Sequence, residues 1–547
     1  MASIRNCLGR SFIVLILLSL SQMLSASTLN EATTESKEAF EKGISEIKTG
    51  KLKKVVVGVE LLINADVQEA EPVLDALLNS NLYRHKKQKE LVYLESDTQE
   101  GRLVRYFNEP DKTELITKKR AIKRVPVNNN LRRAIRGYLA AKNIQNPDVK
   151  VRKAAVQSLL SGVDEESFVL IEKQRLNESN QDVLFLLDTV IALQAFEGES
   201  VTAKMQAIEF LSESLEPDVR NQLQTIVNSG EEPLTGAAQK ALDKIQDKAD
   251  FYSSLETVFF GLSLGSVLVL AAIGLAITFG VMGCINMAHG ELIMIGAYTT
   301  YVIQLLMPDS IGMSILVAIP AAFIVSGLVG IGIERGVIQF LKGRPLETLL
   351  ATFGISLILQ QAVRSIFSPL NRSVETPEWM SGSIDINPIF SITLNRLYII
   401  IFCLAVFALL FFILRKTVLG LQVRAVSQNR DMARSMGVRS EWVDALTFGL
   451  GSGIAGVAGV ALSQLTNVGP NLGQSYIIDS FMVVVFGGVG NLWGTLVAGM
   501  SLGVANKLLE PVSGAVLAKI LVLVFIILFI QKKPRGLFPQ KGRAAEG

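Results

Sequence analysis

Cysteine and histidine are scarce in this chain of 547 residues, which holds three cysteines and two histidines. Cys7 lies in an N-terminal leader, Cys284 and Cys403 lie in apolar segments, and no CxxC pair or Cys/His spacing occurs. The sequence therefore predicts neither a disulfide framework nor a metal site. It also lacks a GxxxxGK[ST] motif, so an ATP-binding loop of the usual kind is not predicted.

Charged residues are scarce only in the second half of the chain. Residues 1–250 hold 34 Lys and Arg, 36 Asp and Glu and 10 glycines, whereas residues 251–547 hold 19 basic residues, 14 acidic residues and 34 glycines. Acidic residues and histidine are too sparse there to predict a catalytic acid/base pair, so no catalytic residue is assigned. No basic stripe with interleaved aromatics occurs either, so nucleic acid is not indicated as a partner.

What the sequence has in abundance is apolar residues. They make up 49% of the chain, and the mean hydropathy of +0.39 exceeds what one soluble core of this size accommodates. The charge-dense first half is typical of a water-soluble domain and the glycine-rich second half of packed membrane helices. We therefore predict an all-α fold in which a helical membrane domain, residues 251–547, follows an exported domain, residues 28–250.

Residues 1–27 have the layout of a signal peptide. Two arginines come first, an apolar run from Phe12 to Leu20 follows, and small residues precede a cleavage point after Ala26 or Ser27. An uncleaved anchor helix is the alternative, although the run is shorter than the roughly 20 residues that span a bilayer. Either version places the following segment outside the cytoplasm.

Residues 28–250 show mostly helical periodicity, with one hairpin predicted from residues 91–94 and 103–107. Asp-Val pairs at Asp148, Asp182 and Asp218 each open an apolar helical run, which favours HEAT-like solenoid repeats near residues 148–250. An irregular helical bundle is the alternative. His85 lies in the polar run RHKKQK and is predicted to be solvated.

The second half contains about nine apolar segments. Those at 475–489 and 494–508 are short enough to be half-spans or broken helices. The segments are 255–281, 287–306, 313–333, 346–367, 397–414, 443–466, 475–489, 494–508 and 514–531.

The basic residues of the loops predict an orientation. If the first apolar segment starts outside, loops 334–345 and 415–442 and the C-terminal tail lie inside, and they carry most of the loop cations. The outside loops then carry only Arg372, Arg396 and Lys507. Because cytoplasmic loops are enriched in Lys and Arg, we predict a bacterial inner-membrane protein with a periplasmic N-terminal domain and a cytoplasmic C-terminus.

Polar residues within or beside the apolar segments are candidates for a translocation path. Arg364 and Lys519 are further candidates, with snorkelling from a helix end the alternative for Arg364. For His289 the alternative is a structural hydrogen bond between helices. The residues predicted to line the path are Asn286, His289, Glu291 and Asp479.

Glycines recur in two patterns. The pairs Gly261/Gly265, Gly449/Gly453 and Gly499/Gly503 have the four-residue spacing that lets helix backbones approach closely in lipid. A denser run predicts an irregular structural turn between two short segments, because a phosphate-binding loop would follow a strand. The glycines of this run are Gly487, Gly488, Gly490 and Gly494.

Six blocks in residues 255–540 resemble, in order, the branched-chain amino acid permeases of ATP-binding-cassette importers. An exported extension containing VPVNNNLRRAIRGYL is in turn similar to the urea-type permeases of that family. The resemblance implies urea as the solute, with a branched-chain or other small amino acid or amide as the alternative. A passive channel and a periplasmic scaffold are alternatives of a different class. The blocks are INMAHGELIMIGAY, ETLLATFGISLILQQ, AVSQNRDMARSMGV, LTFGLGSGIAGVAGVAL, VVVFGGVGNLWGTLVAG and KKPRGLF.

The same resemblance implies a multi-subunit importer embedded in membrane lipid. Its other parts would be a second permease forming a heterodimer, cytoplasmic ATP-binding subunits and a periplasmic solute-binding protein. This chain would bind no cofactor, and its partners would use ATP. Asp431, Met432, Ala433 and Gly437 resemble a degenerate EAAxxxG motif, which makes their loop the predicted ATPase contact. An ordinary positive-inside loop is the alternative.

Overall fold

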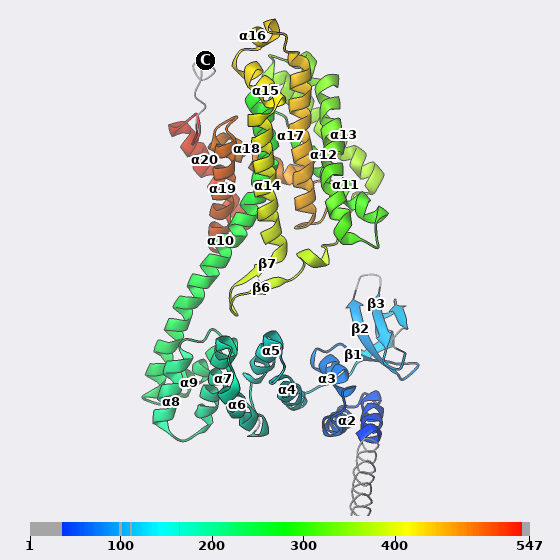
Figure 1. The fold of residues 1–547 in the computed structure, drawn as a ribbon, viewed down its shortest axis with the longest axis vertical. Coiled ribbons are helices and arrows are strands. Elements are labelled where there is room, and N and C mark those ends of the chain that lie inside the picture. The colour runs from blue at the N-terminus through cyan, green and yellow to red at the C-terminus, as the bar shows by residue number, and fades with distance from the viewer. Residues whose placement is uncertain (1–35, 98–100, 110–111, 164, 539–547) are drawn as a thin grey trace, which may run out of the picture. The chain divides into compact units, whose positions relative to one another are not determined.

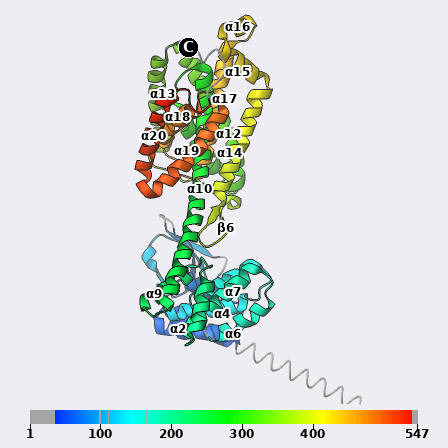
Figure 2. The ribbon, with the colours of Figure 1, turned by 90° about the vertical axis from the view of Figure 1, so that its left-hand side faces the viewer.

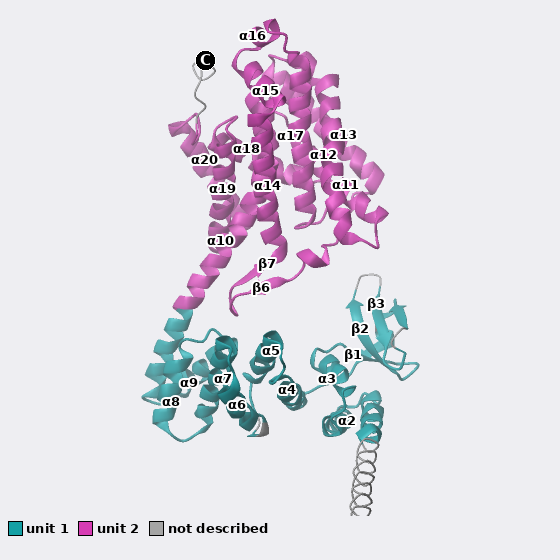
Figure 3. Ribbon diagram, viewed as in Figure 1, with its two compact units in different colours: residues 1–246 teal, residues 247–547 magenta. Residues whose placement is uncertain are grey.

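The computed structural model describes residues 36–97, 101–109, 112–163 and 165–538, so the predicted leader lies outside the described residues (Figure 1). The chain divides into two compact units, residues 1–246 and residues 247–547, which Figure 3 shows in teal and magenta. This division lies close to the composition boundary at Phe251. It falls within α10, Leu234–Met282, a helix of 49 residues.

The first unit contains a five-stranded antiparallel sheet with the order β4-β3-β2-β1-β5. The predicted hairpin is confirmed as β2 and β3, in which Val92 pairs with Tyr106 and Leu94 with Val104. The predicted all-α fold is therefore wrong for this unit. The sequence did not reveal β1, β4 and β5 because each has only three or four residues, too few to show an alternating pattern. The strands are β1 Leu82–His85, β2 Leu91–Asp97, β3 Arg102–Tyr106, β4 Thr113–Ile116 and β5 Ile122–Arg124.

His85 is buried rather than solvated, with 9% of its surface exposed. It ends β1 and pairs with Ile122 of β5, so the neighbouring strand covers it. Its Nδ1 accepts a hydrogen bond from the Gln88 N–H at 3.2 Å. The lysines that follow it in the sequence are exposed, and their polarity concealed the burial of the histidine.

Helices make up the rest of the first unit, and three of them begin where the repeat predicts. Asp148 caps α5 by accepting a hydrogen bond from the Lys150 N–H at 2.9 Å, while Asp182 and Asp218 lie in the first turns of α7 and α9. The helices are α2 Leu52–Ala65, α3 Ala70–Leu78, α4 Asn129–Asn143, α5 Val149–Leu159, α6 Glu165–Asn177, α7 Gln181–Gln194, α8 Val201–Leu211 and α9 Pro217–Ser229.

A buried carboxylate joins two of these helices. The Glu178 side chain is 1% exposed and accepts hydrogen bonds from Arg152 Nε at 2.8 Å and Nη2 at 2.9 Å. These bonds lower the pKa of Glu178 from 4.5 to about 2. A carboxyl with a lowered pKa stabilises the fold above its unfolded pKa, and that contribution disappears as pH falls through the folded pKa.

We therefore predict that acid selectively loosens α5–α7. Between pH 4.5 and pH 2 the full chain in detergent should lose amide protection there, measured by hydrogen–deuterium exchange corrected for the intrinsic rate. Glu178→Gln should already be loosened at pH 6 and should show little further pH dependence. If exchange in α5–α7 depended equally on pH in the wild type and in Glu178→Gln, Glu178 would not be the group responsible.

The second unit is a bundle of helices. Each of the nine predicted apolar segments lies mainly in one of its helices, α10 to α14 and α17 to α20. The elements after α10 are α11 His289–Leu306, α12 Ile311–Gly336, α13 Pro345–Phe367, β6 Ser383–Asp385, β7 Ser391–Thr393, α14 Leu394–Lys416, α15 Val418–Gln428, α16 Arg430–Ser435, α17 Ser440–Ser463, α18 Leu472–Gly487, α19 Leu492–Ser513 and α20 Ala515–Lys532.

Seven helices among the described residues are long and apolar enough to cross a membrane: α10, α12, α13, α14, α17, α19 and α20. α18 has 16 residues and is short, as predicted. The expectation of a short segment at 494–508 is wrong, because α19 continues to Ser513 and has 22 residues. The sequence did not reveal this length because the end of the helix is charged. Lys507 and Glu510 pair there at 2.6 Å.

α17 is the most enclosed helix of the unit. Every residue from Gly451 to Ser463 is buried, and the backbone at Gly456 lies against Gly296 of α11 and Ala322 of α12. α13 and α14 lie on opposite sides of the unit, and α16 lies at the end away from β6 (Figure 2). The buried α17 therefore positions the helices that carry the candidate site.

Glycines allow α10 and α19 to touch along their backbones. A Cβ atom on Gly265 would lie 2.8 Å from Met500 Cα, and one on Gly261 would lie 2.6 Å from Val504 Cα. Both distances are shorter than a carbon–carbon contact permits, so a side chain would force the helices apart. This confirms the close approach that the glycine spacing predicts.

Gly265→Leu should therefore disrupt the bundle, at a cost of about 1–3 kcal/mol or more. The expected result is loss of most of the monodisperse protein after detergent extraction, measured by size-exclusion chromatography. Gly332→Leu is the matched control, because a Cβ atom at Gly332 would meet nothing within 4 Å. Similar yields of the two variants would contradict the packing argument.

Candidate functional site

Three polar residues predicted for the path lie together where α11 begins. Asn286, His289 and Glu291 are each at most 1% exposed. Asn286 Oδ1 accepts from the Ala288 N–H at 3.0 Å and shapes the turn that leads into the helix. His289 Nε2 donates to the Ala271 carbonyl of α10 at 2.8 Å. That bond links two helices, as the structural alternative for His289 predicts.

α13 presents a row of polar side chains that sequence reasoning missed. They recur every four residues and therefore share one helix face. All are at most 6% exposed. The opposite face carries exposed apolar residues such as Leu350 and Ile358. We call the row the α13 ladder: Thr348, Thr352, Ser356 and Gln360.

The middle of the α13 ladder faces the start of α11. Ser356 Oγ donates to Glu291 Oε1 at 3.1 Å, and Thr352 Oγ1 accepts from the Met287 N–H at 3.2 Å. The two elements are 65 residues apart in the sequence, so their polar side chains meet only in the folded bundle. The result is a polar seam between α11 and α13 inside the bundle.

The far end of the α13 ladder meets the segment before α18. Gln360 Nε2 donates to Asn471 Oδ1 at 3.1 Å and to the Pro470 carbonyl at 3.3 Å. Arg364 lies one ladder step further along α13, and its Nη2 donates to the same Asn471 oxygen at 2.8 Å. The seam thus extends from a carboxylate at Glu291 to a guanidinium at Arg364.

Several buried atoms along α11 have no hydrogen-bond partner among the described residues. They are Asn286 Nδ2, His289 Nδ1, Glu291 Oε2 and the Tyr298 hydroxyl. An unpaired polar atom in a protein interior costs roughly 1–3 kcal/mol, so each of these atoms calls for an explanation. These atoms can hydrogen-bond to a polar solute.

The fourth predicted path residue lies apart from this seam. Asp479, in the middle of α18, is 8% exposed and pairs with Lys519 of α20 at 3.3 Å. Its contact ties α18 to α20 rather than to α11 or α13. The structure therefore brings Asn286, His289 and Glu291 to the start of α11, whereas Asp479 pairs with Lys519 of α20.

The predicted coupling loop forms a short helix, α16, after the amphipathic α15. Met432 and Met436 are 61% and 81% exposed, whereas Ala433 is buried. Gly437 ends the helix with φ +87, and the Val438 N–H donates to the Ala433 carbonyl at 3.0 Å. The loop therefore presents two flexible apolar side chains on a fixed turn.

A buried charge network that the sequence analysis did not predict holds this loop to the bundle. Asp444 of α17 is fully buried and accepts from Arg430 Nη1 at 2.7 Å, Arg430 Nη2 at 3.1 Å and Lys342 Nζ at 2.8 Å. Lys342 also lies 3.4 Å from the buried Glu334 of α12. Arg430 is the first residue of α16. The network therefore connects α16 to α17 through Asp444, and to α12 through Lys342 and Glu334.

The glycine run forms a turn between α18 and α19. Gly488 and Gly490 have φ of +102 and +77, in the left-handed region that favours glycine. Residues 537 and 538 pack on this turn, because the Leu537 N–H donates to the Phe486 carbonyl at 2.9 Å and the Phe538 N–H to the Gly487 carbonyl at 3.1 Å. The KKPRGLF ending and the glycine turn are thus one structural element.

The fold and the seam define a class of protein: a polytopic helical membrane protein with a buried polar seam and no catalytic constellation among its described residues. No group of three or more His, Cys, Asp or Glu residues in the described part of the chain could hold a metal ion. These features are typical of membrane transport proteins.

Comparisons with known proteins give the family. The family model for the permease component of branched-chain amino acid transport systems matches residues 257–530. BraD of Pseudomonas aeruginosa, a high-affinity branched-chain amino acid transport system permease, is 31% identical over 297 residues, 53% of this chain and 96% of BraD. LivH of Salmonella typhimurium, described in the same words, is 30% identical over 298 residues, 52% and 96% of the two chains. No solved structure matches.

A more distant relative is RbsC of Haemophilus influenzae, a ribose import permease. It is 24% identical over 271 residues, 48% of this chain and 79% of RbsC. The chain belongs to the branched-chain amino acid permease family, and the matched part is its membrane unit. It is a transporter subunit and not an enzyme, and partner subunits hydrolyse the ATP that drives such a permease.

Proposed function

We propose that this chain forms half of the membrane channel of an ATP-driven importer for branched-chain amino acids or closely related zwitterions. The family and the names of BraD and LivH support this substrate class. The observation that carries the proposal is Glu291, a buried carboxylate with one oxygen unpaired, on a seam that ends at Arg364.

The charged residues of the seam favour a zwitterionic amino acid over urea as the solute. Urea is neutral and needs hydrogen-bonding groups but no fixed countercharge. A zwitterionic amino acid carries an ammonium group that a buried carboxylate can pair with. Ser356 and Arg364 are eight residues apart on α13, which is about 12 Å along a helix. An amino acid would therefore meet Glu291 and Arg364 in succession, with Gln360 of the α13 ladder between them.

ATP hydrolysis would be coupled to this path through α16. Met432 and Met436 project from it, and exposed methionines adapt to a partner surface. The network around Asp444 would pass a push on α16 to α12 and α17 as a rigid-body movement. The partners in this proposal are cytoplasmic ATP-binding subunits, a second permease and a periplasmic solute-binding protein.

The proposed orientation places α15 and α16 in the cytoplasm and residues 28–250 in the periplasm. The excess of basic residues in the loops at the α16 end supports it. The protein would then lie in a bacterial inner membrane. Cysteine labelling tests this, since a cysteine at Ser427 should react only in inverted vesicles and one at Thr202 only in intact spheroplasts.

Uptake by cells with and without this chain tests the substrate. We expect loss of high-affinity uptake of labelled leucine on deletion, with urea uptake unchanged, and restoration by the intact gene. Loss of urea uptake alone would overturn the amino acid assignment in favour of the urea-type alternative. If uptake of both persisted in cells shown to express all the partners, both solute assignments would fail.

A further inference from the structure

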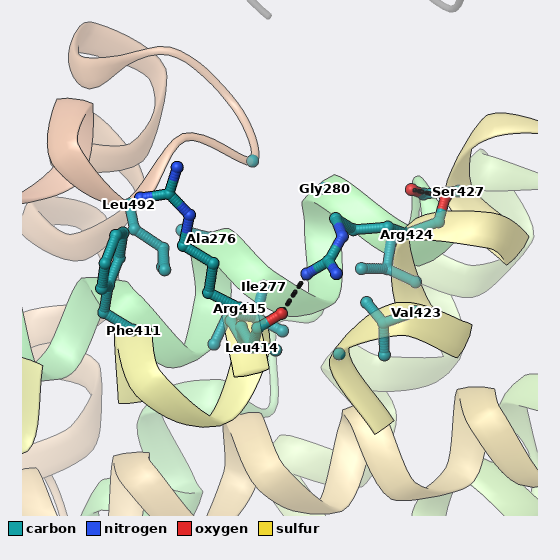
Figure 4. Close-up of a pocket in the computed structure, with 13 residues that line it drawn as sticks. Ala276, Ile277, Gly280, Phe411, Leu414, Arg415, Val423, Arg424, Ser427 and Leu492 are labelled. Atoms are coloured by element: carbon teal, nitrogen blue, oxygen red, sulfur yellow. Dashed lines mark hydrogen bonds between the residues drawn. The ribbon is translucent and has the colours of Figure 1, made fainter. Parts of the chain in front are cut away.

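The membrane unit has a pocket at the end where α16 lies (Figure 4). Its volume is about 230 Å³. It lies among the C-terminal ends of α10 and α14, the inner face of α15 and the glycine turn before α19. Most of its wall is apolar and includes Ile277, Leu414, Val423 and Leu492.

Two arginines line this pocket. Arg424 of α15 donates through Nη1 to the Leu414 carbonyl, and Arg415 lies with its Cζ 5.2 Å from the centre of the Phe411 ring (Figure 4). Among the described residues neither arginine forms an ion pair with a carboxylate. Two guanidinium groups at one apolar pocket are therefore left without an anion.

The neighbouring helix surface matches a bilayer boundary. Val418 and Leu421 of α15 are 70% and 61% exposed, although both are apolar. Gly420, Val423 and Val426 of the same helix are buried against the bundle. A helix that shows exposed apolar residues beside basic ones, directly after a membrane span, is typical of a helix lying in the interface.

We propose that this pocket binds the phosphate group of an acidic phospholipid. Arg415 and Arg424 would pair with the phosphate, for which guanidinium is well suited. The acyl chains would extend over Val418 and Leu421 into the bilayer. A basic pocket between membrane helices at the lipid surface favours an anionic head group over a zwitterionic one.

The bound lipid would connect α10 and α14 to the segment that leads into α16. The pocket walls come from α10, α14, α15 and the glycine turn, and α15 leads directly into α16. One lipid would thus contact all four of these elements. Acidic lipid should therefore stabilise the purified chain against heat.

Binding of phosphatidylglycerol, measured by native mass spectrometry and by thermal unfolding in neutral detergent, tests the proposal. We expect one tightly bound phosphatidylglycerol per chain and at least tenfold weaker binding of phosphatidylethanolamine. Arg415→Gln should weaken phosphatidylglycerol binding about tenfold. Lys416→Gln is the matched control, because it removes an adjacent cation that does not line the pocket, and it should change binding less than about twofold.

Other results would overturn the proposal. Equal binding of phosphatidylglycerol by the Arg415→Gln and Lys416→Gln variants would show that the pocket is not the binding site. Glycerol phosphate that competes as tightly as the lipid would indicate a site for free phosphate compounds. Arg424→Gln is a second variant, but its loss of the Leu414 hydrogen bond can affect folding. Arg415→Gln alone decides the matter, because the Arg415 side chain contacts the Phe411 ring and forms no side-chain hydrogen bond among the described residues.

Discussion

Replacing Asp444 with asparagine is expected to lower solute uptake more than tenfold while the protein still inserts and folds. Asp444 is fully buried and accepts three hydrogen bonds from Arg430 and Lys342. Asparagine keeps the shape but removes the charge, and it turns an N–H group toward one of the cations. The link between α16 and α17 would then open, because the cations would remain without a buried anion.

Removing one partner of a buried ion pair destabilises a protein by roughly 3–5 kcal/mol, so Asp444→Ala should fold poorly. Asp444→Asn is the informative variant, measured by uptake and solute-stimulated ATP hydrolysis in the reconstituted importer. Glu441→Gln is its control, because Glu441 lies three residues before Asp444, in the first turn of α17, but is exposed. Normal uptake by Asp444→Asn would exclude the network from coupling.

Replacing Glu291 with glutamine should lower leucine uptake by at least tenfold. Glutamine can still accept the Ser356 hydrogen bond that Glu291 Oε1 accepts at 3.1 Å. What it loses is the negative charge, and a hydrogen bond to a charged group contributes about 1.5–3 kcal/mol. A neutral solute such as urea does not use that charge, so its movement should change little.

The control for Glu291→Gln is Glu347→Gln. Glu347 lies in the first turn of α13, is exposed and pairs with Arg344 at 3.2 Å, away from the α13 ladder. It should leave leucine uptake unchanged. If Glu291→Gln transported leucine as well as the wild type, a zwitterion would not pair with Glu291, and the seam would serve only to hold α11 to α13.

The membrane helices could be predicted from the sequence because lipid imposes a strict rule. Every backbone polar group must be bonded within the membrane, so long apolar segments become helices. α19 shows the limit, since its predicted apolar segment stops at residue 508 although the helix continues to Ser513. In the first unit the strands β1, β4 and β5 are too short to show an alternating pattern. Of its five strands, only the hairpin of β2 and β3 was predictable.

The candidate site was only partly predictable, because some of its residues form a local pattern along one helix and others meet only in the folded chain. The α13 ladder is a local pattern, and its four-residue spacing from Thr348 to Gln360 is visible in the sequence. The network of Arg430, Lys342 and Asp444 is not, because Lys342 lies 102 residues before Asp444 and joins the other two only in the folded bundle. In the sequence Arg430 and Lys342 are only cations of two loops.

The most direct test of the account is leucine uptake into proteoliposomes that hold the purified importer with either wild-type chain or Glu291→Gln, at matched protein content. The account predicts ATP-dependent uptake of labelled leucine by the wild type and at most a tenth of that rate by the variant, with Glu347→Gln at the wild-type rate. Wild-type vesicles that take up labelled urea but not leucine, or a Glu291→Gln variant that transports leucine normally, would contradict it.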